Sequence, residues 1–466
     1  MPLRDIAVTL AVFGALPYIY VRPQIGILMW TWIAYMVPHK ISWGFARDFQ
    51  FAMIIAVVTV FAWLMSRESK KLPIDIVTTL MITLAIWVSI TTIFAVNHSL
   101  AMWDWERAMK ILAMTFLAII IMQNRKWIEA QVWVIVCSLG FYGVKGGVFM
   151  VTGGGGRVYG PHAGLFSENN ALGLVLIMIV PLIWYLQTRV KNFFGVWALR
   201  GSIALIMLAI IGTHSRGAAV GAAAMVLFLL IKSRKRALLA FGMAVGIFAA
   251  IPFVPSEWFE RIETIKTYEE DSSALGRIQA WTFAVGVALD NPILGGGFEV
   301  NASSELFYKY VPDALGARTF HSSIFQMLGE HGFVGLAIYL LLGVSAFLCG
   351  SGIIRRTRRQ PEFYWANDLA RMIQVSIVGY AVGGLFLDMA FLDLYYHLVA
   401  LMVLTKIVVA REMAEAKLKV SHEEAEAAPN SLFESARLAP VGPQPTDQGS
   451  PLPRVETSLR PPPKAP

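Results

Sequence analysis

Charged residues and cysteines are scarce in this chain. Only 15% of its 466 residues are Asp, Glu, Lys or Arg, against about a quarter in soluble domains. Hydrophobic residues make up 56%, and the mean hydropathy is +0.60. This composition excludes a soluble globular protein, a coiled coil and a disordered chain. The two cysteines, Cys137 and Cys349, lie inside apolar runs, which excludes a disulfide framework and a cysteine-based zinc site.

Long polar blocks are also lacking, because apolar runs follow one another along most of the chain. A helix needs about 20 apolar residues to cross the hydrocarbon core of a membrane. Candidate crossings lie near 50–65, 74–95, 108–122, 127–151, 170–187, 201–212, 217–231, 236–253, 324–350, 370–388 and 394–410. We therefore predict an all-α integral membrane protein with about 12 transmembrane helices.

The start of the chain allows two interpretations. Two shorter apolar runs, 5–21 and 24–37, are interrupted by Arg22 and Pro23, which predicts either two crossings or one broken crossing. No clean small-residue cleavage site follows the first run, so we expect this segment to be retained rather than removed as a signal peptide.

The net charge of +8 lies mostly in short loops between the apolar runs, so it indicates membrane topology rather than nucleic-acid binding. Alternate loops near 67–71, 125–126, 189–200, 232–236 and 355–359 hold 16 lysines and arginines, whereas the opposite short loops hold five. By the positive-inside rule the first set faces the cytoplasm. The stretch near 254–321 is then outside and the C-terminal tail is cytoplasmic. One net crossing at the start gives twelve spans and a cytoplasmic N-terminus, whereas two crossings would give thirteen spans and place the N-terminus outside.

This topology divides the chain into four parts. We expect N-terminal transmembrane helices over 1–253, one large outer loop over 254–323, and C-terminal transmembrane helices over 324–410. The last part, 411–466, is predicted to be a disordered cytoplasmic tail, because the final fifty residues hold 10 of the 22 prolines.

The outer loop carries its own helical pattern. In GRIQAWTFAVGVALDNP, the residues Ile278, Trp281, Val285 and Leu289 recur at helical spacing, which predicts an amphipathic helix lying on the membrane surface. A tight turn should follow at Gly295-Gly296-Gly297. Because no GxxxxGK[ST] pattern is present, these glycines do not form a P-loop.

Most ionisable residues near the predicted spans lie at the outer ends of those spans, and few lie near the middle of the membrane. A transporter should place its coupling groups at the midplane, so the pattern favours an enzyme acting at the interface. Three outer arginines, Arg157, Arg216 and Arg277, lie in glycine- or serine-rich settings suited to phosphate oxygens. The alternative for each arginine alone is a snorkelling side chain at the interface or a salt bridge. Lys40, Arg47 and Arg318 are interpreted as surface charges.

A histidine lies where the last part of the outer loop enters a span. His321 opens HSSIFQMLGEHGFVGL and is suited to act as a general base near neutral pH, although a capping histidine is the alternative. Glu330 follows nine residues later. On a continuous helix it would point about 180° away from His321, so we do not expect a His–Glu dyad. Asp388 and Asp393 match no metal-ligand spacing and are expected to bond helix ends. We therefore predict no metal site.

Four segments together resemble the O-antigen ligase/polymerase superfamily. HSSIFQMLGEHGFVGL is similar to the family's histidine followed by E-x-G-x-x-G, here Glu330, Gly332 and Gly335. NPILGGGF, THSRGA and GRIQAW resemble its other motifs, and the similarity runs from about 150 to 410. The opening segment RPQIGILMWTWIAYMVPHKISWGF resembles a branch described as O-glycosylation ligases.

The resemblance implies a membrane glycosyltransferase fold of the bacterial inner membrane, whose large periplasmic loop contains amphipathic helices. It implies an O-antigen ligase of lipopolysaccharide biosynthesis, which transfers a glycan from undecaprenyl diphosphate to a hydroxyl of lipid A-core, without a metal or other cofactor. By motif, the catalytic residues are His321, Arg216 and Arg277. The donor diphosphate is bound by these two arginines, and Arg157 is added as a substrate-binding residue by the reasoning above. No nucleic acid partner is expected.

Three alternatives stay open. An O-antigen polymerase of the same superfamily shares the donor and the chemistry. A protein O-oligosaccharyltransferase differs only in its acceptor, a Ser or Thr hydroxyl. A transporter of lipid-linked glycans belongs to another class and is disfavoured by the lack of charge at the midplane.

Overall fold

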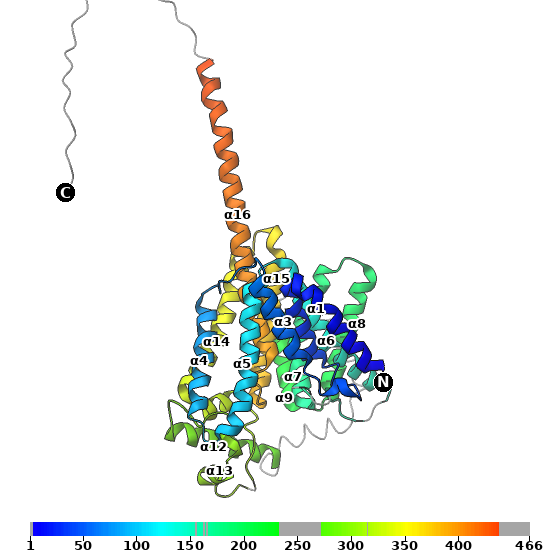
Figure 1. Cartoon of the computed structure of the whole chain (residues 1–466), viewed down its shortest axis with the longest axis vertical. Coiled ribbons are helices and arrows are strands. Elements are labelled where there is room, and N and C mark those ends of the chain that lie inside the picture. The colour runs from blue at the N-terminus through cyan, green and yellow to red at the C-terminus, as the bar shows by residue number, and fades with distance from the viewer. Residues whose placement is uncertain are drawn as a thin grey trace, which may run out of the picture. The chain divides into compact units, whose positions relative to one another are not determined.

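The computed structural model describes residues 3–153, 156–161, 164, 166–232, 272–314 and 316–437, and all regular elements in these ranges are helices (Figure 1). The α-helices are α1 (Leu3–Val21), α2 (Pro23–Met36), α3 (Phe51–Met65), α4 (Ile76–Ile93), α5 (His98–Ile121), α6 (Arg125–Val151), α7 (Asn169–Arg189), α8 (Phe193–Gly212), α9 (Arg216–Lys232), α12 (Ser272–Asp290), α13 (Ser304–Tyr310), α14 (Ser323–Thr357), α15 (Tyr364–Gly383) and α16 (Asp393–Arg437). Short 3-10 turns are η1 (Phe45–Arg47), η4 (Val300–Ala302), η5 (Pro361–Phe363) and η6 (Gly384–Phe386).

Eight helical segments are long and apolar enough to cross a membrane. They are Leu3–Val21, Ile76–Ile93, Arg125–Val151, Asn169–Arg189, Phe193–Gly212, Ser323–Thr357, Pro361–Phe386 and Asp393–Glu423. The prediction of an all-α membrane protein is confirmed at this level, whereas the count of twelve crossings and the large periplasmic loop stay predictions. The expected crossing at 236–253 and the first part of the expected loop, 254–271, lie outside the described residues.

Residues Met1–Arg411 form one compact unit, with α7 at its centre. α7 packs against α6, α8, α9 and α15, and its residues from Ala171 to Ile183 are buried. A helix that is apolar on every side needs such a position, surrounded by other helices. By contrast α8 leaves Phe193, Phe194 and Trp197 exposed, as expected for a helix with one face toward lipid.

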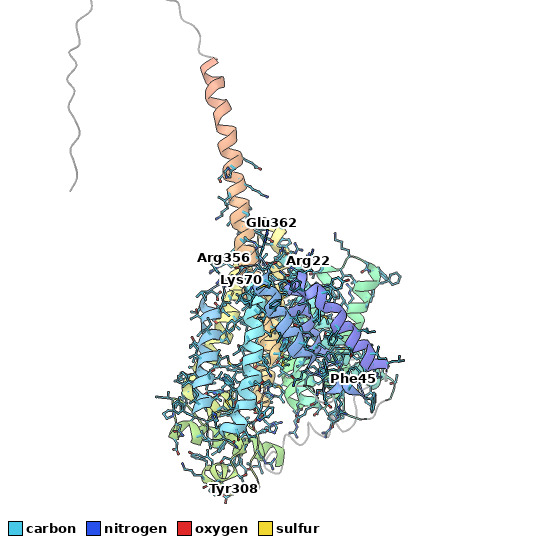
Figure 2. The ribbon with its side chains drawn as sticks, viewed as in Figure 1. Arg22, Phe45, Lys70, Tyr308, Arg356 and Glu362 are labelled. Carbon is cyan, nitrogen blue, oxygen red and sulfur yellow. The ribbon has the colours of Figure 1, made fainter. Side chains whose placement is uncertain are left out.

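The two ends of this unit differ in their side chains. Lys70 and Arg356, from two loops predicted to be cytoplasmic, lie at the same end of the helices as Arg22 (Figure 2). Tyr308 on α13 lies at the opposite end, where α12 and α13 are placed (Figures 1 and 2). The elements that carry the candidate site therefore gather away from the most basic loops.

Two segments add to what the sequence predicted. Residues 3–36 form two helices, because Arg22 adopts an extended conformation and Pro23 begins α2 at its first turn. Two crossings and one broken crossing both stay predictions for this segment. At the other end, α16 continues to Arg437, so residues 411–437 of the expected disordered tail are helical. Alanine, glutamate and lysine dominate residues 411–428, and these residues favour helix strongly enough to extend a helix that has already begun.

Candidate functional site

His321 lies just before α14, on a strained piece of backbone. Its φ of 46° is left-handed, which is uncommon for a residue other than glycine. Its Nδ1 atom is 3.9 Å from the Asp388 carboxylate, and its Nε2 atom is 3.3 Å from the Thr319 hydroxyl. With 46% of its side chain exposed, the imidazole lies beside an acid on one side and remains accessible.

The Asp388 carboxylate contacts the N-terminal end of α14 as well as the His321 imidazole. Its carboxylate accepts a hydrogen bond from the backbone amide of Ser322, at 3.2 Å, which fits the expected role in bonding a helix end. Burial raises the pKa of Asp388, while hydrogen bonding from the His321 backbone and the charge of the His321 ring oppose that rise. The sequence does not reveal the pairing of Asp388 with His321, because 67 residues separate them and no local pattern joins them.

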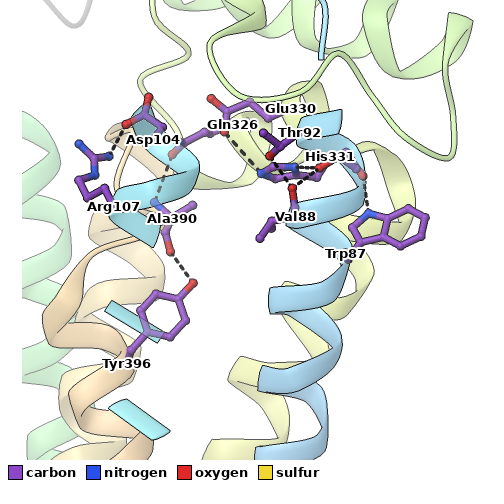
Figure 3. A network of polar contacts seen from close by, with 11 residues as sticks. Trp87, Val88, Thr92, Asp104, Arg107, Gln326, Glu330, His331, Ala390 and Tyr396 are labelled. Atoms are coloured by element: carbon purple, nitrogen blue, oxygen red, sulfur yellow. Dashed lines mark hydrogen bonds and ion pairs between the residues drawn. The ribbon is translucent and has the colours of Figure 1, made fainter. Parts of the chain in front are cut away.

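The turn that carries Asp388 is tied to the start of α14. The Ser323 hydroxyl donates to the Leu387 carbonyl at 2.9 Å and accepts from the Met389 amide at 3.2 Å. The Ala390 amide donates to the Gln326 side chain at 3.2 Å (Figure 3). These contacts fix the distance between His321 and Asp388, because both residues adjoin the same bonded segment.

Arg216 is the first residue of α9, and that helix begins beside the same turn. A Cβ atom added to Gly217 would lie only 2.8 Å from the Phe386 Cβ atom, two residues before Asp388. The turn before Arg216 is ordered by Asn169, whose amide donates to the Thr213 carbonyl at 2.7 Å, and by the Ser215 hydroxyl, which accepts from the Ala218 amide at 3.1 Å. The N-terminus of α9, which carries a partial positive charge, thus adjoins the segment that holds the imidazole.

Arg277 lies on α12, which is fastened to the chain just before His321. Trp281, one turn further along α12, donates its indole N–H to the Phe320 carbonyl at 2.9 Å and stacks on Phe325 with a centroid distance of 4.8 Å. Because residues four apart share a helix face, Arg277 is on the side of α12 that meets this segment. Its side chain is half-buried.

Arg318 is a cation that sequence reasoning treated as a surface charge. Its guanidinium crosses α12 at Gly276, where an added Cβ atom would lie 2.8 Å from the Arg318 Nη1 atom. Arg318 is therefore next to Arg277 along the helix and three residues before His321. The signal in the sequence is Gly276, because only glycine leaves room for a side chain to lie this close to the helix axis.

Arg157 is less closely connected to the other residues. It is exposed, and the amide of the next residue, Val158, donates to the Gly212 carbonyl at 2.8 Å. Its segment thus runs beside the end of α8, four residues before Arg216. The structure therefore places Arg157 near the α8–α9 turn.

The E-x-G-x-x-G segment forms a break inside α14. Gly332 has φ 69° and ψ −172°, so the helix is interrupted there. The amides of Gly296 and Gly297 donate to the carbonyls of Gly329 and Glu330, at 2.9 and 2.7 Å, and the Phe333 amide donates to the Pro292 carbonyl at 2.9 Å. The glycine turn after α12 therefore satisfies polar groups that an unbroken helix would pair internally. This geometry agrees with a turn function for these glycines.

Glu330 and His331 precede the break and are buried. The Glu330 carboxylate lies 3.8 Å from the His331 Nε2 atom, whereas the side-chain contacts of His321 are with Thr319 and Asp388. This geometry is consistent with the expected absence of a His321–Glu330 dyad. His331 itself binds Thr91 through Nδ1 at 2.7 Å and accepts the Trp87 indole N–H at its carbonyl (Figure 3). His331 therefore joins α4 to α14, which is a structural role.

A carboxyl pair lies close to this region. Asp104 on α5 forms an ion pair with Arg107 at 3.2 Å (Figure 3), and its carboxyl lies close enough to Glu299 to affect the pKa of Glu299. Burial and the Asp104 carboxyl raise the pKa of Glu299 to about 7, against the opposing charge of Arg107, and Asp388 adds to the rise. Two carboxyl groups in contact share a proton more readily than they both ionise.

This pair predicts a pH dependence of stability. An acid whose pKa is raised on folding contributes stability that is complete below its ordinary pKa of 4.5 and is lost as the pH rises toward 7. In detergent, the melting temperature of the wild type should therefore fall between pH 4.5 and 7 relative to that of Glu299→Gln. The control is Glu305→Gln, at an exposed position on α13. Parallel pH curves for the wild type and Glu299→Gln would contradict the assignment.

Three segments that bear arginines adjoin residues close to His321. The start of α9, with Arg216, lies beside Phe386; α12, with Arg277, is bonded to Phe320 through Trp281 and is crossed by Arg318 at Gly276. In the described ranges, no group of three or more His, Cys, Asp or Glu side chains is placed to hold a metal ion.

Two family models match the chain. Residues 201–340 match the family described as O-antigen ligase, and residues 3–191 match a family of unknown function (DUF5935). The first match begins in α8, ends within α14 and contains Arg216, Arg277 and His321. No curated protein matches the chain at a significant level.

Proposed function

We propose, because this chain belongs to the O-antigen ligase superfamily, that it transfers a glycan from undecaprenyl diphosphate to a hydroxyl of lipid A-core. The family resemblance predicted from the motifs is confirmed, and it supports activity of the ligase or polymerase type on lipid-linked glycans. The finer assignment is an inverting, metal-independent transfer at the periplasmic face of the bacterial inner membrane. The observation that carries it is the imidazole of His321, held by Asp388 beside segments that bear arginines.

The arginines act on the leaving group. As the bond between the anomeric carbon and the phosphate oxygen breaks, negative charge grows on the diphosphate, and fixed cations stabilise that charge more in the transition state than in the ground state. Arg216 and Arg277 are proposed to bind the diphosphate through paired N–H groups, which suit phosphate oxygens. Arg318, which adjoins Arg277, adds a third guanidinium, and Arg157 contacts the donor from the loop beside α8.

His321 acts on the acceptor. Its Nδ1 atom faces Asp388, so Nε2 is assigned to receive the proton of the acceptor hydroxyl, which takes the place of the Thr319 hydroxyl that contacts Nε2 at 3.3 Å. The acceptor oxygen then bonds to the anomeric carbon as the diphosphate leaves from the opposite side, which inverts the configuration. The imidazolium that forms is stabilised by the Asp388 carboxylate.

A deletion in the native host, complemented by variants, tests this function. With a ligase, loss of the gene should remove polymer from lipid A-core while polymer accumulates on undecaprenyl diphosphate. Wild type should restore the polymer, whereas Arg277→Ala should not. Accumulation of single repeat units would identify a polymerase instead, and loss of glycan from proteins with intact lipopolysaccharide would identify a protein O-oligosaccharyltransferase.

A further inference from the structure

The loop that follows the glycine turn is fastened on two sides. On one side, the Val96 amide, just before α5, donates to the Gly296 carbonyl at 2.9 Å. On the other side, the ring of Phe298 meets the ring of His331 edge-on, at the break in α14, with a centroid distance of 4.6 Å. Glu299 is the next residue, so its position is set by contacts with both the start of α5 and the break in α14.

Glu299 links the surroundings of His321 to helix α5. Its backbone has φ 56° and ψ 27°, a left-handed conformation that is uncommon for a residue other than glycine. The Asp104 and Asp388 carboxyls lie close enough to raise its pKa, and the Arg107 guanidinium lies close enough to oppose that rise. Asp388 is also the acid 3.9 Å from the His321 ring. Glu299 and Asp104 therefore extend the polar site from His321 toward α5, where Arg107 is 48% exposed.

A buried carboxyl oxygen without a partner faces this group. Glu330 is only 3% exposed, and its side chain extends from α14 toward Asp104 on α5 (Figure 3). Its carboxyl interacts electrostatically with Asp104, Glu299 and Asp388. Among the described residues its Oε2 atom has no hydrogen-bond partner, and the His331 Nε2 atom is too far away at 3.8 Å. Such an oxygen is costly to bury, which indicates a place for a ligand that donates hydrogen bonds.

The charge of this group suits hydroxyls better than a cation. Arg107 forms an ion pair with Asp104, and a pKa of about 7 leaves Glu299 protonated in part of the molecules near neutral pH. In the described ranges these carboxyls are not placed to hold a metal ion. The group thus offers both hydrogen-bond donors and acceptors, as each sugar hydroxyl also does. Several hydroxyls of one sugar match it better than the single hydroxyl of a serine or threonine side chain.

We propose that Glu299 and Asp104 bind hydroxyl groups of a sugar acceptor, another hydroxyl of which then lies at His321. This inference rests on the proposed function and deepens it, because it assigns the acceptor to the carbohydrates. Asp104 lies within residues 3–191, outside the part of the chain that matches the O-antigen ligase family. A region matched only by a family of unknown function thereby takes part in recognition of the acceptor.

The test measures binding of acceptor probes to the full chain in nanodiscs, without donor. The probes are the core oligosaccharide released from the lipid A-core of the native host, an oligosaccharide of one O-antigen repeat unit, and a serine-containing peptide. The variants are Glu299→Ala, Asp104→Ala and Glu299→Gln, each shown to be folded by its melting transition. Glu106→Gln is the matched control, because Glu106 also lies on α5 but is 53% exposed and pairs with Lys110.

The wild type should bind at least one of the two sugar probes. Glu299→Ala and Asp104→Ala should weaken that binding about tenfold or more, as expected for hydrogen bonds to charged groups. Glu299→Gln keeps a hydrogen-bonding side chain of the same shape and should weaken binding less, and it also serves if the alanine variants do not fold. Glu106→Gln should leave the affinity unchanged.

Three results overturn the inference: no binding of either sugar by the wild type, binding of the peptide alone, or unchanged sugar affinity in the folded Glu299 and Asp104 variants. Because no donor is present, unchanged sugar affinity leaves the proposed transfer to lipid A-core untouched. Conversely, binding of the repeat unit in place of the core oligosaccharide, weakened in the same variants, would support the sugar site while contradicting the ligase function.

Discussion

Replacing His321 by alanine is expected to lower glycan transfer about 10²–10⁴-fold while donor affinity stays close to that of the wild type. This range is usual for the loss of a general base. The physical reason is the separation of roles: the imidazole faces Asp388 and an accessible side, whereas binding of the diphosphate is assigned to the arginines. The measurements are the transfer rate and the donor affinity of purified protein in nanodiscs, in the presence of EDTA.

The arginines should respond differently in the same assays. Arg277→Ala and Arg216→Ala should weaken donor binding as well as turnover. Lysine at either position keeps the charge but loses the forked donors, so it should restore function only in part. His98→Ala provides a matched histidine control, because the His98 ring bonds the Thr92 carbonyl rather than Asp388. Transfer by His321→Ala at the wild-type rate, or normal donor affinity in both arginine variants, would refute these roles.

Replacing Gly332 by alanine is expected to destabilise the folded protein severely. The conformation at Gly332, with φ 69° and ψ −172°, is one that residues with a Cβ atom rarely adopt, and strain of this kind costs about 1–3 kcal/mol. In addition, the new Cβ atom would lie 2.3 Å from the Ile293 carbonyl oxygen. Relief of that overlap requires the turn after α12 to move, which breaks hydrogen bonds between the turn and α14.

The matched control is Gly352→Ala on the same helix. Apart from the adjoining backbone of α14 itself, no described part of the chain lies within 4 Å of a Cβ atom added there. Alanine should therefore be neutral or slightly stabilising, since it favours helix over glycine. The measurement is thermal unfolding in detergent, monitored as the fraction of the protein that remains monodisperse at each temperature. Equal melting temperatures for the two variants would show that the break in α14 does not depend on glycine.

Several features follow from the sequence because they depend on local composition. Apolar runs of membrane-spanning length predict an all-α membrane protein. In lipid the backbone polar groups of such a segment must be paired within the segment, which a helix achieves. The tight turn at Gly295–Gly297 is also local, because φ is positive at Gly295 and Gly297. The motifs around His321, Gly332 and Gly335 were enough to identify the superfamily.

Other features depend on contacts between segments that are distant in the sequence, and no local sequence pattern encodes such contacts. Packing decides three of them: the pairing of His321 with Asp388, the position of Arg318 against Gly276, and the contact of the glycine turn with the break in α14. Helix α12 is a similar case: its apolar spacing was visible, but Trp281 packs inward because Phe320 and Phe325 present a carbonyl and a ring at that place. The sequence by itself predicted the membrane class, the family and His321 as a candidate base. The tertiary structure decided which side chains lie beside His321, because side chains distant in sequence become neighbours only when helices pack.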